Sequence, residues 1–125
     1  MRHVVSAMLV LVAIIHLMPL SGVLGAERLA ALYGLDFGEP NLALLMRHRS
    51  VLFGLLGSFL LLAAFRPEWQ PLAFVAAFAS IASFLFFAWG GARNPQVQRV
   101  VVADVVALVC LLVAVVAYVY EHRGV

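Results

Sequence analysis

Long apolar runs separated by short polar segments make up most of the chain. Four of these runs are close to the length of about 20 residues that a helix needs to cross the hydrocarbon core of a membrane. They predict spans over about residues 4–24, 42–65, 72–89 and 99–120. The pattern therefore predicts an all-α protein, a single transmembrane domain over 1–125 in which four helices pack as a bundle.

Helix-breaking and capping residues lie close to the ends of these runs. Pro19 predicts a kink in the first span beside His16, because proline cannot donate to the carbonyl one turn earlier. Pro40 suits the first position of a helix, and Asn94 followed by Pro95 suits an N-cap and the start of the last helix.

The longest connection, residues 26–41, carries a short helical pattern of its own. Its apolar residues share a face opposite Glu27 and Arg28, and Gly34 suits a helix C-cap. The segment predicts a short interfacial helix over about 27–33.

Small residues recur at helical spacing on three spans. In lipid such stripes let helix backbones approach closely, since van der Waals contact is then the main packing force. They predict tight packing within the bundle or against a partner. The stripes are Ser50, Gly54 and Ser58; Ala73, Ala76, Ala77, Ser80 and Ser83; and Ala103, Ala107, Cys110, Ala114 and Ala117.

Composition supports the membrane class and excludes several functions. Of the 125 residues, 66% are hydrophobic and 11% are charged, whereas about a quarter of a soluble domain is charged. The net charge of +2 comes from scattered arginines, which does not favour nucleic-acid binding. The single cysteine, Cys110, excludes an intrachain disulfide and a multi-cysteine metal site.

The first apolar run resembles a signal peptide with a cleavage site near Gly25, but it is longer than a typical signal-peptide core. We expect an uncleaved first span. The distribution of arginines slightly favours both termini outside, and the balance becomes level if Arg47 and Arg49 have a buried role.

The alternating topology brings polar residues from several helices to one side of the membrane. The candidate polar pocket consists of His16, Glu27, Arg47, His48, Ser83 and Asp104. The carboxylate of Asp104 is expected about 8 Å inside the membrane interface, where a charged group needs a partner. Arg47 is the expected one, because it shares a face with Ser50 and Gly54, whereas Arg49 is expected to reach the head groups.

Two interpretations of this cluster stay open. In the first, Asp104 and Arg47 form a structural salt bridge, and His16 bonds to Ser83 or to the carbonyl of Ile15. In the second, the residues line a pocket, and Asp104 relays protons for a quinone or other isoprenoid head group held by His16 and the arginine. Haem ligation by His16 and His48 is less favoured, and a metal site is not expected because too few ligands converge.

A resemblance covers nearly the whole chain. The segment from His16 to Leu29, then Leu32-Tyr33-Gly34, Pro40-Asn41 and the segment from Leu45 to Gly54, resemble small bacterial four-helix membrane proteins similar to the DoxX-like class. The resemblance implies a multi-pass protein of the bacterial inner membrane, and some members of the class pass electrons to quinone. Proteins of this group often carry the label phosphopantetheine adenylyltransferase, but neither the histidine arrangement nor a phosphate-binding glycine-rich turn of such an enzyme is present.

Three functions are compatible with these features. The first is an accessory or structural subunit that packs with membrane lipids, with itself as a homo-oligomer, or with a partner membrane protein. The second is a quinone-linked or lipid-modifying membrane enzyme, for which no catalytic residue can be assigned. The third is a transporter of a small solute or proton, which would require an oligomer.

Overall fold

The computed structural model describes residues 2–91 and 93–123, apart from the side chain of Ala26, and every regular element within them is a helix. Four segments are long and apolar enough to cross a membrane, two of them continuous α-helices and two of them an α-helix joined to a 3₁₀ helix. The elements are α1 (Arg2–Leu17), the 3₁₀ helix η1 (Met18–Leu24), α2 (Ala26–Tyr33), α3 (Pro40–Ala63), the 3₁₀ helix η2 (Pro67–Trp69), α4 (Gln70–Ala88) and α5 (Pro95–Arg123).

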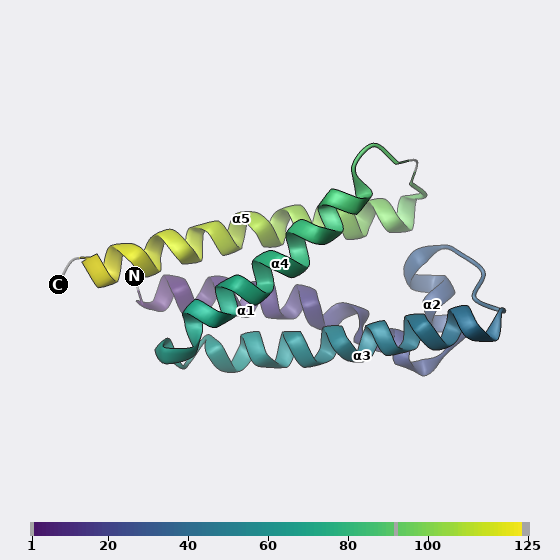
Figure 1. Cartoon of the computed structure of the whole chain (residues 1–125), viewed down its shortest axis with the longest axis horizontal. Coiled ribbons are helices and arrows are strands. Elements are labelled where there is room, and N and C mark those ends of the chain that lie inside the picture. Colours follow the sequence, from purple (N-terminus) through teal and green to yellow (C-terminus); the bar gives the residue numbers. More distant parts are fainter. Residues whose placement is uncertain (1, 92, 124–125) are drawn as a thin grey trace.

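The four long helices run alongside one another (Figure 1). Helix α1 packs mainly against α5 and α3, and α4 crosses obliquely and packs against α5 and α3. The start of α1, the α3–α4 turn and the end of α5 lie at one end, called here the terminal end. Helix α2, the start of α3 and the α4–α5 connection lie at the other, called here the loop end. Consecutive long helices therefore run in opposite directions between the two ends.

Local sequence signals set several helix ends. Pro40 is at the first position of α3, and the Asn94 side chain caps α5 by accepting a 2.7 Å hydrogen bond from the Val97 N–H. Gly34 ends α2 in the left-handed conformation, with φ of 68°. These three predictions are confirmed. The disruption expected at Pro19 takes the form of a change from α to 3₁₀ geometry after Leu17.

Glycine permits the close approach of α1 and η1 to α3. A Cβ atom on Gly57 would lie 2.7 Å from Leu17 Cγ and 3.1 Å from the backbone oxygen of Ala13, so a larger residue would require Leu17 and the adjacent α1 backbone to shift. A Cβ on Gly54 would lie 2.6 Å from Leu20 Cδ1. The small-residue stripe of α3 is therefore occupied by the first span of the same chain, except that Ser58 faces outward.

The small residues of α4 and α5 are also largely buried within the chain. Ala73, Ala77, Ala107 and Ala114 are fully buried in the main apolar core, together with Leu9, Leu60, Ile81 and Leu111. Fewer small residues are consequently left on the outer surface for a partner. That surface is instead covered by large apolar side chains, such as Leu55, Leu62, Val75, Phe78, Val109 and Val116.

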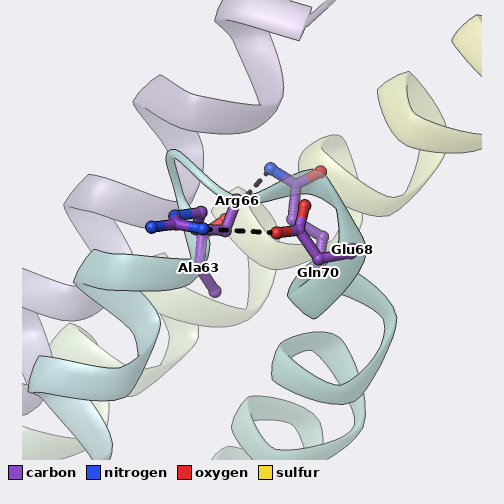
Figure 2. A network of polar contacts seen from close by, with 4 residues as sticks. All are labelled: Ala63, Arg66, Glu68 and Gln70. Atoms are coloured by element: carbon purple, nitrogen blue, oxygen red, sulfur yellow. Dashed lines mark hydrogen bonds and ion pairs between the residues drawn. The ribbon is translucent and has the colours of Figure 1, made fainter.

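Polar contacts close the α3–α4 turn at the terminal end (Figure 2). The buried Gln70 amide donates to the Ala63 oxygen at 3.1 Å, and Ser6 Oγ donates to the Ala64 oxygen at 2.6 Å. Arg66 and Glu68 form an exposed ion pair at 3.6 Å. Carbonyl groups at the end of α3 thus accept hydrogen bonds from side chains of both neighbouring helices.

Substituting Gly57 by leucine is expected to destabilise the fold, because the side chain would press on Leu17 and on the α1 backbone. Overpacking of this kind costs about 1–3 kcal/mol. Gly91→Leu is the matched control, since the nearest atom to a Cβ there is the Ala88 oxygen at 3.9 Å. Thermal unfolding in detergent, followed by circular dichroism, should show a lower midpoint for Gly57→Leu alone, and equal midpoints for both variants would contradict the packing described.

Candidate functional site

A cavity of about 240 Å³ lies at the loop end, between α1, η1, α2, α3 and α5. Its walls are mostly apolar, and the residues with polar groups are His16, Tyr33, Arg49, Gln96, Arg99 and Asp104. Mostly apolar walls with a few convergent polar groups are typical of small-molecule sites, although this volume is below their usual range of about 300–1,000 Å³. The cavity therefore suits a small head group more than a large cofactor.

His16 is buried on the cavity wall, and both of its ring nitrogens have partners in the protein. Nδ1 lies 2.9 Å from the Val12 oxygen, and Nε2 lies 3.2 Å from Ser80 Oγ. Because a carbonyl oxygen can only accept, Nδ1 carries a proton and a neutral ring accepts at Nε2. His16 thus fixes the position of α1 against α4, and it has no free nitrogen to offer a ligand.

Arg49 extends from α3 into the region between α3 and α2. Its Nη1 donates a 2.5 Å hydrogen bond to the Tyr33 hydroxyl, and its guanidinium carbon lies 4.5 Å from the centre of the Phe53 ring. Phe53 follows Arg49 by one helical turn, so the two side chains share a face of α3. The guanidinium is held in place by these two neighbours, and it has further N–H groups that can donate, since arginine has five donors.

The first three turns of α5 supply the opposite wall. Gln96, Val100 and Asp104 recur every four residues and thus form one stripe, with Arg99 and Ala103 beside it. Asp104 is half-buried and is the only carboxylate among the described residues that line the cavity. Within the described part of the chain no cation lies within 4.0 Å of its carboxylate.

The expected pairing of Arg47 with Asp104 is not found. Arg47 is exposed, and its Nε donates a 3.0 Å hydrogen bond to the Val23 oxygen at the end of η1. The expectation assumed that the small-residue face of α3 turns toward α5, whereas this face packs against α1 and η1. Arg49, which was expected to reach the head groups, is the α3 arginine that lines the cavity with Asp104, and Arg99 of α5 lines it as well.

Three other residues of the predicted pocket lie outside it. Glu27 and His48 are exposed and do not line the cavity. Ser83 is also exposed, and its hydroxyl donates to the Ser80 oxygen at 3.0 Å. Ser80, one turn earlier on α4, occupies the position beside His16 that was expected for Ser83. Of the six predicted residues, the cavity contains His16 and Asp104.

Sequence reasoning missed Tyr33, Gln96 and Arg99. The four-residue spacing from Gln96 to Asp104 was available as a signal for the α5 wall, because it places both residues on one helical face. No comparable signal identified Tyr33. Its place depends on how α2 folds back, which is determined by contacts far apart in the chain.

Asn94 connects α2 to α5. While its Oδ1 caps α5, its Nδ2 donates a 2.8 Å hydrogen bond to the Tyr33 oxygen, near the end of α2. The buried Leu29, Tyr33 and Phe37 form a second small apolar core under α2. Helix α2 is thus held over the cavity by the hydrogen bonds of Asn94 and Arg49 to Tyr33 and by one apolar cluster.

Metal binding finds no support in the described residues, where no group of three histidine, cysteine or carboxylate side chains is placed to hold an ion. Haem ligation by His16 and His48 is also not supported, because His48 lies outside the cavity and both nitrogens of His16 have protein partners. A second hollow, lined by Ala82, Leu85, Phe86 and Trp89, is apolar.

Comparisons of the chain with models of protein families, with curated proteins and with solved structures give no match.

Replacing Asn94 by alanine is expected to loosen both α2 and the first turn of α5, because one side chain serves both. Loss of an N-cap costs about 0.5–2 kcal/mol. Hydrogen exchange should accelerate over residues 26–33 and 95–99. The control is Asn41→Ala, since the exposed Asn41 side chain bonds only to Glu39. Unchanged exchange over 26–33 in the Asn94 variant would contradict the tie.

Proposed function

We propose that the chain is a multi-pass membrane protein that binds the head group of an amphipathic small molecule in the cavity at its loop end. The observation that carries the proposal is the cavity itself, in which two arginines and a carboxylate lie among apolar walls. An amphipathic ligand would match both kinds of lining at once. The proposal is one of binding, with no reaction assigned.

The surface of the long helices supports the membrane location. Large apolar side chains face outward on all of them, including Ile14, Leu55, Phe78 and Val116, which are 50%, 63%, 52% and 68% exposed. Soluble proteins rarely leave such extended apolar surfaces in water. The resemblance to DoxX-like proteins makes the bacterial inner membrane the proposed location.

Ionisable groups inside membrane-spanning segments usually face the protein interior and have a functional role. Asp104 fits this description, because it lines the cavity. Two earlier turns of α5 line it as well. Its lack of an ion pair among the described residues argues against the purely structural salt bridge. The carboxylate is therefore available to a ligand or to a proton.

A quinone or other isoprenoid molecule remains one candidate ligand. Its carbonyl oxygens would accept hydrogen bonds from Arg49, Arg99 or Gln96, while Asp104 would accept from a hydroxyl group of the reduced form. His16 would not act as a donor, because its nitrogens already have partners.

An accessory subunit is the second candidate, favoured by one observation. Phe86, Phe87 and Trp89 at the end of α4 are 76%, 82% and 88% exposed, and Phe86 and Trp89 border the apolar hollow on α4. These aromatic side chains would suit contact with a partner helix as well as contact with lipid. Light scattering of Phe86→Ala and Phe87→Ala, compared with the wild type in detergent, would test this role through a change in assembly size.

Filling the cavity should prevent binding if the proposal is correct. Ala103 lines the cavity, so Ala103→Phe would occupy part of its volume, whereas Val102→Phe places the same ring on the outer surface. Two 12-carbon photoreactive probes, an acid and an alcohol, would be crosslinked in nanodiscs and mapped by mass spectrometry. Crosslinks are expected on residues 15–19 and 96–104 of the wild type.

Ala103→Phe should reduce this labelling by about tenfold, the factor that corresponds to an overpacking cost within about 1–3 kcal/mol. Val102→Phe should label as the wild type does. Equal labelling of both variants, with unchanged circular dichroism, would refute the proposed site. Native mass spectrometry of protein purified in mild detergent would also reveal a ligand that is retained.

A further inference from the structure

The charges that line the cavity are unequal. Two guanidiniums, of Arg49 and Arg99, face one carboxylate, that of Asp104. Arg49 is half-buried and Arg99 is exposed. Neither arginine has a carboxylate within 4.0 Å in the described part of the chain, where the ion pair is that of Arg66 and Glu68 at the terminal end. The two arginines of the cavity thus exceed its carboxylate by one positive charge.

The hydrogen-bonding groups of the cavity are also mainly donors. His16 uses both ring nitrogens within the protein, and the Tyr33 hydroxyl already accepts from Arg49. Within the described part of the chain, the remaining N–H groups of Arg49 and those of Arg99 have no protein acceptor. Guanidinium groups bind planar carboxylates through two parallel hydrogen bonds, so this arrangement favours an acceptor that is flat and negative.

On the basis of the proposed function, we propose that the occupant is a single-chain amphiphile with a carboxylate head group. The carboxylate would bind to Arg49 and Arg99 near the mouth of the cavity, and the first part of the chain would contact Leu32, Phe53 and Val100. A volume of about 240 Å³ admits such a head group more readily than a two-chain lipid.

Asp104 would restrict the charge of the ligand. A phosphate monoester carries about −1.5 to −2 charge at neutral pH, and the second negative charge would be repelled by the Asp104 carboxylate. A carboxylate brings a single negative charge, which the excess of one arginine balances. Asp104 reduces the net charge of the cavity to +1. It would therefore favour a ligand with a single negative charge.

The test compares head groups on one chain length. Dodecanoic acid, dodecanol and dodecyl phosphate would each compete with the photoreactive acid probe for the wild-type protein in nanodiscs of zwitterionic lipid. We expect the acid to bind about tenfold more tightly than the alcohol, because a hydrogen bond to a charged group is worth about 1.5–3 kcal/mol and tenfold corresponds to 1.4 kcal/mol. The acid should also bind more tightly than the phosphate.

Variants of the arginines identify the group responsible. Arg49→Gln should bring the ratio of acid to alcohol affinity close to one, and Arg49→Lys should keep part of the preference because the charge remains. Arg99→Gln, at an exposed position, should lower the ratio without affecting the fold. Arg28→Gln removes the same charge from an exposed site on α2 that does not line the cavity, and should leave the ratio unchanged.

The outcomes separate the two levels of the proposal. If acid and alcohol compete equally in the wild type, or the phosphate binds best, the inferred head group is wrong while the cavity is still a binding site. If Arg28→Gln lowers the ratio as much as Arg49→Gln, the preference reflects general surface charge and the inference also fails. If no probe labels residues 15–19 or 96–104, both the inference and the proposed function are refuted.

Discussion

The close contact of α1 with α3 and α5 is the constraint on which the remaining structure depends. In lipid, apolar side chains gain little by leaving one apolar environment for another, so helices associate where small residues permit backbone contact. Ala13 against Gly57, with Ala107 and Ala114 on α5, provides this contact along the middle of the molecule. Toward the loop end α1 gives way to η1, and the cavity lies where its last turns meet η1, α2, α3 and α5.

The helical elements could be predicted because their signals are local. Pro40, Asn94 and Gly34 determine helix ends through the geometry of one or two residues, and the apolar runs between them are long. The all-helical architecture follows from the same runs. The 3₁₀ geometry of η1 was not predictable in this way, because a proline such as Pro19 permits a kink, a break or a tighter helix according to what packs beside it.

The candidate site could be predicted only in part, for a different physical reason. His16 and Asp104 stand out as polar residues within apolar runs, and both line the cavity. To choose between Arg47 and Arg49 as the arginine beside Asp104, one must know how α3 is rotated about its axis. That rotation depends on which helix covers the small residues of α3. Because η1 and α1 cover them, the adjoining flank of α3 with Arg49 faces α2 and lines the cavity with α5. Sequence spacing gives relative angles on one helix but not the direction in which the helix faces.

The 3₁₀ segment η1 also has a consequence for membrane thickness. The 16 residues of α1 extend about 24 Å, which is less than the hydrocarbon core of about 30 Å. The seven residues of η1 rise about 2.0 Å each and add about 14 Å, compared with about 10 Å in α geometry. The first span thereby reaches about 38 Å, close to the 36 Å of the 24-residue α3. A 3₁₀ segment at its end thus lets the first span reach about the length of α3 with one residue fewer.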